Sequence, residues 1–149
     1  MLKHGFATCI FLGCLLASGR ISAMNCHTGG GHEEHQHEEQ EMLKGYCASQ
    51  GHATGKVKVC RGMEEVAKFK EGEILVACMT QPEYVPAMKK AAAIVTDEGG
   101  LTCHAAIISR ELGKPCIIST KKATRILKDG MTVEVNATEG WVKILKKKE

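Results

Sequence analysis

The sequence predicts a single mixed α/β domain built from short strands and a few helices. Runs rich in valine and isoleucine predict strands at 56–60, 74–77, 93–96, 116–119, 132–135 and 141–144. Apolar residues at helical spacing predict helices at 82–90 and 102–112, with a shorter one at 63–69. A chain of 149 residues is long enough for one domain with a modest core and too short for several.

The helix expected at 102–112 has clear start and stop signals. It follows the apolar run 91–95 and a turn at Gly99 and Gly100. Thr102 is the predicted N-cap because a hydroxyl oxygen can accept a hydrogen bond from an unpaired N–H of the first turn. Gly113 suits the left-handed residue that ends a helix, and Pro115 prevents continuation.

His104 falls in the first turn of this helix. Its ring would lie beside unpaired backbone N–H groups and the positive end of the helix dipole, a position that suits phosphate. An imidazole there could accept a phosphoryl group covalently and pass it on. The alternative interpretation is a structural histidine whose ring is satisfied by its neighbours.

The residues Gly-Gly-Leu-Thr-Cys-His-Ala-Ala-Ile-Ile-Ser-Arg-Glu-Leu-Gly-Lys-Pro at 99–115 resemble a known signature. It is that of the phosphohistidine, or swivelling, domain of the phosphoenolpyruvate (PEP)-utilising enzymes, which include PEP synthase, pyruvate phosphate dikinase and enzyme I of the sugar phosphotransferase system. The segments 48–57, 73–88, 123–130 and 138–140 resemble the opening, middle and close of that domain. The resemblance covers residues 46–145 and implies a swivelling β/β/α domain in which His104 accepts and donates a phosphoryl group.

The same resemblance assigns roles to the neighbours of His104. Gly99, Gly100, Cys103 and Arg110 would bind or position phosphate, and Thr102 would cap the helix, hydrogen-bond the phosphoryl group, or do both. Cys103 also reads as a small packing residue, since adjacent helical residues do not face each other. Arg110 and Glu111 alternatively form a solvated ion pair. Ser119 stands where the resemblance implies glycine.

The length of the chain limits what it can do alone. The ATP-binding domain and the large PEP-binding barrel of the family do not fit in 149 residues. We therefore expect a phosphotransferase component whose phosphoryl donor and acceptor are ATP-binding and PEP- or pyruvate-binding domains on other chains, with no tightly bound cofactor. The alternatives are a non-catalytic regulatory module of the same fold and a metal-binding protein.

The first 45 residues have a different composition from the rest. Residues 1–23 resemble a secretory signal, or a leader that is not translated if synthesis starts at Met24. Their apolar run is too short for a stable membrane span. Because PEP and ATP are cytoplasmic, we expect a cytoplasmic protein, with export as the alternative. Residues 24–45 form a His/Glu-rich arm expected to be disordered, and 46–149 form the swivelling domain.

The arm also offers metal ligands. A nitrogen and sulfur ligand set that would suit zinc, nickel or copper is provided by Cys26, His27, His32, His35 and His37.

Charge and composition do not indicate a polyanionic partner. The formal net charge is only +3 and aromatic residues make up 4% of the chain, so we expect no nucleic-acid binding.

Overall fold

The computed structural model describes residues 41–147. Its strands are β1 (Met42–Lys44), β2 (Tyr46–Ser49), β3 (His52–Val59), β4 (Ile74–Ala77), β5 (Ala93–Thr96), β6 (Cys116–Ile118), β7 (Thr132–Asn136) and β8 (Trp141–Lys146). Its helices are α1 (Met63–Ala67), the 3₁₀ turn η1 (Pro82–Tyr84), α2 (Val85–Lys90), α3 (His104–Leu112) and α4 (Ala123–Ile126).

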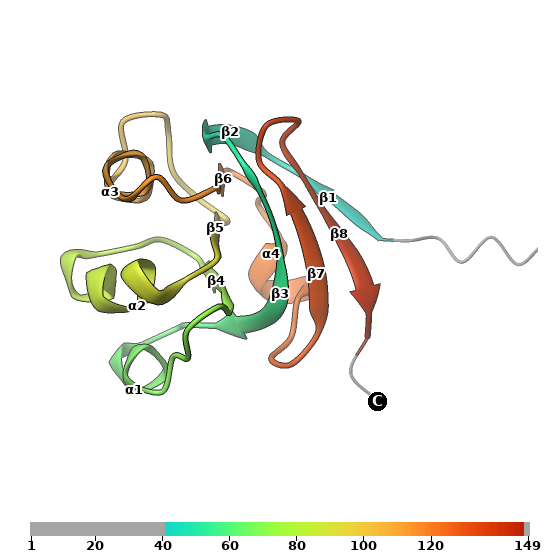
Figure 1. Ribbon diagram of the computed structural model, residues 1–149, viewed down its shortest axis with the longest axis horizontal. Helices are drawn as coiled ribbons and strands as arrows, with labels where there is room; N and C mark the ends of the chain where they lie inside the picture. Colours follow the sequence, from blue (N-terminus) through green and yellow to red (C-terminus); the bar gives the residue numbers. More distant parts are fainter. Residues whose placement is uncertain (1–40, 148–149) are drawn as a thin grey trace, which may run out of the picture. The chain divides into compact units, whose positions relative to one another are not determined.

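Strand β3 joins two layers of sheet (Figure 1). Residues 52–56 of β3 pair antiparallel with β7, whereas residues 57–59 pair parallel with β4. One layer continues antiparallel through β7, β8 and β1. The other continues parallel through β4, β5 and β6 and ends at β2, which is antiparallel to β6. The long strand therefore divides its hydrogen bonds between the two layers.

Alternation along the parallel strands builds two cores, one on each face. Ile74, Val76 and Val95 point into the core between the two sheet layers. Leu75 and Ile94 point the other way, into a core covered by α1, α2 and α3. Because both faces are covered, these strands read as continuous apolar runs, as is usual for parallel strands. The result is the expected β/β/α arrangement.

Most predicted elements are found close to their expected bounds, and the strands at 74–77 and 93–96 match in full. The short elements β1, β2 and α4 were not predicted. Residues 42–44, which we assigned to the arm, instead form β1 against β8, with Leu43 buried in the core between the sheets. The proposed signal at 1–23 and the remainder of the arm lie outside the described residues.

Candidate active site: His104 at the carboxyl edge of the parallel strands

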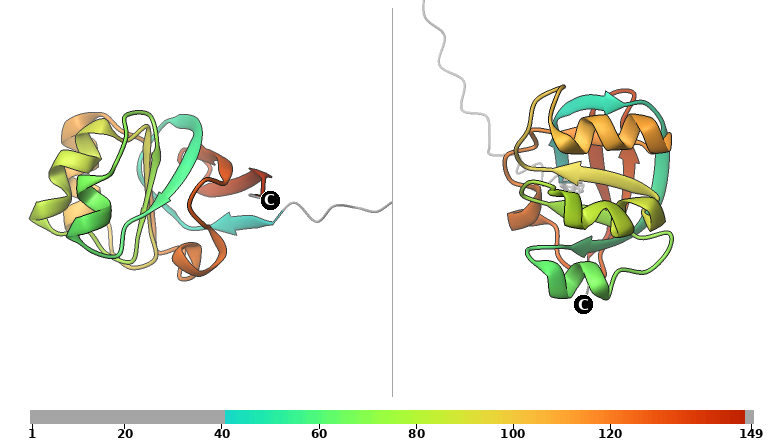
Figure 2. Two further views of the ribbon diagram at one scale, coloured as in Figure 1. Left: turned by 90° about the horizontal axis from the view of Figure 1, so that it is seen from below. Right: turned by 90° about the vertical axis from the view of Figure 1, so that its left-hand side faces the viewer.

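Three loops meet where the parallel strands β4, β5 and β6 end. They are residues 78–81 after β4, 97–103 after β5 and 119–122 after β6. Figure 2 shows the loop that leaves β5 turning back into α3, so that the start of this helix lies at the same edge. In open sheets with parallel strands this is the edge at which ligands usually bind. The fold thus places His104 at the favoured edge.

His104 is the first residue of α3 and is only partly exposed. Its Nδ1 lies 3.1 Å from Oγ1 of Thr80 in the loop after β4, and Thr80 is 4% exposed. When Nδ1 carries the ring proton and donates it to this hydroxyl, Nε2 keeps its lone pair. No described residue forms a hydrogen bond with Nε2. The contact holds Nδ1 and leaves Nε2 without a hydrogen-bond partner among the described residues.

The N-cap of α3 is Cys103, which corrects the prediction of Thr102. Cys103 has extended backbone angles (φ −71°, ψ 165°), and its carbonyl accepts the first helical bond from Ile107 N–H at 3.1 Å. Its side chain makes no capping bond. The loop uses one more residue than predicted before the helix begins, because Cys103 N–H closes a turn onto Gly100 O at 3.0 Å. Thr102 is exposed beside the helix start.

An uncapped start leaves backbone donors available at His104. The first N–H groups of a helix lack partners within the helix, and in α3 these belong to His104, Ala105 and Ala106. Together with the helix dipole they favour an anion beside the ring. The end of α3 matches the prediction, since Gly113 is left-handed (φ 62°) and its N–H bonds to Arg110 O at 3.2 Å.

Gly99 allows the loop to pass close to the helix start. Its φ is +128°, and a Cβ built at this position would lie 2.8 Å from the Cys103 sulfur. Both observations require glycine here. Cys103 packs against the helix-side core, as predicted for a small packing residue. A Cβ at Gly100, by contrast, would meet no atom within 4 Å.

Arg110 holds the loop before the helix in place. Its Nε donates to Ala48 O of β2 at 2.7 Å, and a terminal nitrogen donates to Leu101 O at 2.8 Å. The guanidinium therefore ties the edge strand β2 to the segment that delivers His104. Within the described part of the chain, Arg110 forms no ion pair with Glu111. The structure thus gives Arg110 a scaffold contact.

Helix α3 packs against the sheet through small side chains. Ala105, Ala106 and Ser109 are its buried residues, whereas Ile107 is 46% exposed. Small residues let the helix backbone approach the sheet closely, and Ile108 and Leu112 pack at the margin of the core. Ile107 faces solvent because it lies two residues from both Ala105 and Ser109, which places it on the opposite side of the helix from these buried residues.

Comparison with known proteins agrees with this geometry. Residues 69–140 match the family model described as the mobile domain of PEP-utilising enzymes. Those residues belong to that family. A probable PEP synthase of Archaeoglobus fulgidus is 58% identical over 123 residues, and the PEP synthase of Pyrococcus furiosus is 54% identical over 122. Each match covers 78% of this chain, but only 16% and 15% of the two relatives.

The fold of the mobile domain also occurs in a solved structure. Aconitase X of Thermococcus kodakaraensis aligns with a TM-score of 0.55 at 22% identity, over 71% of this chain and 99% of that chain. At this identity the likeness concerns the fold alone. It supports the β/β/α architecture inferred from the sheet order.

Asp97 is a structural residue of the mobile domain that the sequence analysis missed. It follows β5 directly, is 6% exposed, and accepts hydrogen bonds from the Thr120 hydroxyl (3.1 Å) and the Thr124 N–H (3.3 Å). The Thr124 hydroxyl also donates to it. The carboxylate thereby caps α4, to which it is not adjacent in sequence. An acidic residue at the end of a buried strand was the available signal.

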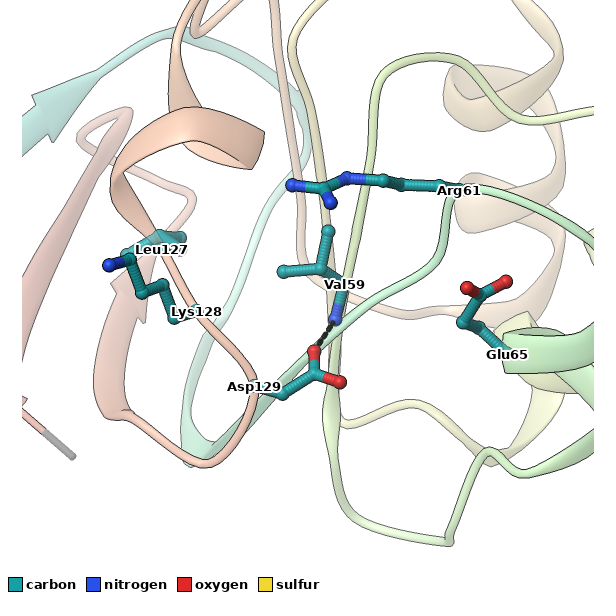
Figure 3. Close-up of a pocket in the computed structure, with 6 residues that line it drawn as sticks. All are labelled: Val59, Arg61, Glu65, Leu127, Lys128 and Asp129. Carbon is teal, nitrogen blue, oxygen red and sulfur yellow. Dashed lines mark hydrogen bonds between the residues drawn. The ribbon is translucent and has the colours of Figure 1, made fainter. Parts of the chain in front are cut away.

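Two cavities adjoin the carboxyl edge of the mobile domain. The larger, of about 340 Å³, is lined by Val59, Arg61, Glu65, Leu127, Lys128 and Asp129 (Figure 3). Its charges are of both signs, and Asp129 is engaged by the Val59 N–H at 2.7 Å and by Lys58 Nζ at 2.6 Å. No histidine or cysteine is among its lining residues. The smaller cavity, of about 270 Å³, lies beside β2 and β6.

Neither the predicted metal site nor a membrane span is found in the described residues. In residues 41–147, no three His, Cys, Asp or Glu side chains gather so that they could hold a metal ion. The five predicted ligands from Cys26 to His37 lie outside that range. The helices of the same range include none that is long and apolar enough to cross a membrane.

Proposed function

We propose that this mobile domain is a phosphoryl carrier and that Nε2 of His104 bears the phosphoryl group. The observation that carries the proposal is the contact between Thr80 Oγ1 and His104 Nδ1 at the start of α3. With Nδ1 donating to Thr80 in this contact, Nε2 keeps its lone pair and is the ring nitrogen that would attack. The family match at residues 69–140 supports the same role.

The transfer balances without a further reactant. The Nε2 lone pair attacks the phosphorus of the donor, a P–N bond forms, and the P–O bond to the leaving group breaks. The leaving oxygen keeps the electron pair. Nδ1 retains its proton, donated to the Thr80 hydroxyl, which supports the positive charge that develops on the ring. Attack by an acceptor oxygen on the same phosphorus reverses these steps and frees Nε2.

Backbone dipoles would stabilise the charge on the transferring group. The N–H groups of Ala105 and Ala106 are available at the helix start, where the helix dipole also favours an anion. We propose that the exposed Thr102 hydroxyl adds a hydrogen bond to the phosphoryl oxygens. Arg110 would act indirectly, by positioning the Gly99–Gly100 loop through its bond to Leu101.

The donor and acceptor would be supplied by other domains. The chain spans about 15% of the PEP synthases that it matches, so the remainder of such an enzyme has no counterpart in it. We propose that ATP-binding and PEP- or pyruvate-binding domains deliver and receive the phosphoryl group, in the cytoplasm where these metabolites occur.

Phosphorylation can be tested by mass spectrometry under alkaline conditions, which preserve phosphohistidine. We expect the full chain, incubated with extract of its own cells and either ATP or PEP, to gain one acid-labile phosphoryl group that maps to His104. His104→Ala should abolish the modification and retain the fold, because His104 is partly exposed.

The matched control is His52→Ala. His52 is an exposed histidine of β3 whose Nε2 lies 2.8 Å from Glu134 Oε1. This variant should be phosphorylated like the wild type. Persistent labelling of His104→Ala would contradict the assignment of the residue. Failure of the wild type to be labelled by either donor would favour the regulatory-module alternative.

A further inference from the structure

The smaller cavity at the carboxyl edge has an unusual lining. It is formed by the end of β1, the start of β2 and the loop after β6, through the residues Lys44, Gly45, Tyr46, Ser119, Thr120 and Lys121. Its volume of about 270 Å³ is ample for a phosphate group. We call it the lysine cavity. It is separate from the His104 ring, which does not line it.

The charge of the lysine cavity is of one sign. Lys44 and Lys121 both line it, and no carboxylate is among the lining residues. The Asp97 carboxylate lies behind the lining, where it accepts a hydrogen bond from the Thr120 hydroxyl at 3.1 Å. Neither ammonium group takes part in an ion pair within residues 41–147. The 340 Å³ cavity differs in this respect, since Glu65 and Asp129 accompany its two cations. Cations that lack a partner at a concave surface attract a compact oxyanion.

Hydroxyl groups add donors to the same surface. Tyr46 is 68% exposed, and no described residue hydrogen-bonds the Ser119 hydroxyl. The Thr120 hydroxyl is already committed, because its one proton is shared between Thr96 O at 2.9 Å and Asp97 Oδ1 at 3.1 Å. The cavity therefore offers two cations and two free hydroxyls, which is a suitable donor set for a phosphate or carboxylate group.

The backbone of this loop adopts an unfavourable conformation. Ser119 (φ 59°) and Lys121 (φ 64°) are the only non-glycine residues of positive φ in the described part of the chain, and both line the lysine cavity. Glycine would adopt this conformation without the steric cost that a Cβ brings. Such strain is found preferentially at functional sites. Here it places a serine and a lysine in the lining of the cavity.

The lysine cavity is connected to the loop that delivers His104. Thr120 N–H bonds to Thr96 O at 3.1 Å, and Lys121 N–H bonds to Asp97 O at 3.0 Å. The loops after β5 and β6 are thus held side by side, as expected for strands about 4.8 Å apart. An anion in the cavity would lie at the same edge of the sheet as the phosphoryl group.

We propose that the lysine cavity binds an oxyanion of the phosphoryl donor other than the phosphoryl group that is transferred. A small donor with two anionic groups, such as a nucleoside triphosphate or PEP, would be anchored by one group while another faces His104. The anchoring role rests on the proposed phosphoryl-carrier function. The binding of an oxyanion in the cavity does not, and it can be measured separately.

The test is a titration of the ¹⁵N-labelled full chain with inorganic phosphate, followed by amide shifts. We expect saturable shifts at Gly45, Tyr46, Thr120 and Lys121, and a separate response at the Ala105 and Ala106 amides if phosphate also meets the helix start. Lys44→Gln combined with Lys121→Gln should weaken binding at the cavity about tenfold or more while leaving the helix response unchanged.

The matched control is Lys70→Gln combined with Lys90→Gln. Both lysines are exposed and lie by the amino ends of β4 and β5, where Lys70 O and Lys90 O accept from Glu73 and Gly72. This pair removes the same charge at the opposite edge and should leave the cavity shifts intact. Equal weakening by the two double variants would show general charge attraction and would overturn the proposal.

Ser119→Gly provides a second, independent variant. Removing the hydroxyl should weaken phosphate binding at the cavity, whereas relief of the positive φ should raise the denaturation midpoint. A purely structural residue would show the second effect alone, which would contradict a role for Ser119. Absence of cavity shifts in the wild type with phosphate, ATP and PEP would overturn the proposal, even if His104 is phosphorylated.

ATP and PEP form the two arms that identify the source of the oxyanion. Cavity shifts at lower concentration with ATP would assign a second phosphate of a nucleotide, and those with PEP would assign its carboxylate. Either result supports the site. His104→Ala removes phosphoryl transfer but not the cavity. Phosphate binding in the cavity of this variant would therefore show that the binding proposal holds whether or not His104 is phosphorylated.

Discussion

The Thr80 hydroxyl lies 3.1 Å from Nδ1 of His104, although 24 residues separate them in sequence. Thr80 follows β4 and His104 begins the helix after β5, so the contact exists only because these parallel strands are neighbours. It determines which ring nitrogen faces solvent and which is held by the protein.

Removing the Thr80 hydroxyl should slow phosphorylation of His104. Valine has nearly the same shape, so Thr80→Val should preserve packing while Nδ1 loses its partner. We expect the rate to fall about tenfold, the kinetic equivalent of a hydrogen bond of about 1.4 kcal/mol. Thr80→Ser keeps a hydroxyl and should retain most of the rate. Equal rates for wild type and Thr80→Val, measured in single-turnover labelling, would contradict the positioning role.

Arg110→Lys should loosen the loop before α3. A single ammonium group cannot reproduce the fixed pair of bonds to Ala48 O and Leu101 O. We expect the free energy of unfolding to fall by about 1–2 kcal/mol and amide exchange across 98–103 to accelerate. The control is Arg125→Lys, at an exposed arginine of α4. Unchanged exchange in Arg110→Lys would show that the loop holds its conformation without the guanidinium.

Asp97→Asn should destabilise the loops that meet at the carboxyl edge. The buried carboxylate accepts from Thr120 and from both the N–H and the hydroxyl of Thr124. The amide nitrogen of asparagine is itself a donor and would face the donors of Thr120 and Thr124. We therefore expect the unfolding free energy, measured by urea denaturation, to fall by about 2–3 kcal/mol. Glu98→Gln, at the exposed neighbouring position, should change stability little. Similar losses for the two variants would mean that the Asp97 bonds contribute no net stability.

Cys116 should make the fold sensitive to alkaline pH. Burial raises the pKa of this thiol from its ordinary value of 9.0 to about 12. The folded state therefore favours the neutral thiol, and stability present below pH 9 is lost progressively as the pH rises toward 12. Between pH 8 and pH 10 this one group should cost about 1.4 kcal/mol of unfolding free energy.

Cys116→Ala should remove that loss. Its unfolding free energy should fall less between pH 8 and pH 10 than that of the wild type, although the variant starts lower because the side chain is fully buried. Val76→Ala, at a fully buried residue that does not titrate, should lower stability but follow the wild-type pH dependence. Parallel curves for wild type and Cys116→Ala would show that the thiol does not carry the effect.

Local sequence patterns determined the parts of this domain that depend on near neighbours. Strands β4 and β5 were predicted because continuous apolar runs are needed where a strand is covered on both faces. The end of α3 was predicted because only glycine easily takes the left-handed angle of Gly113. The identity of His104 as the candidate nucleophile likewise came from the turn and helix around it.

Tertiary structure decided the features that join distant segments. Strands β1 and β2 are three and four residues long, and only pairing with β8 and β6 holds them extended. The N-cap moved from Thr102 to Cys103 because the Gly99–Gly100 turn closes one residue later. Thr80 and Asp97 meet their partners across neighbouring strands, and the lysine cavity brings together residues of β1, β2 and the loop after β6. Local preference cannot determine such contacts, since the side chains are brought together only when the sheet forms.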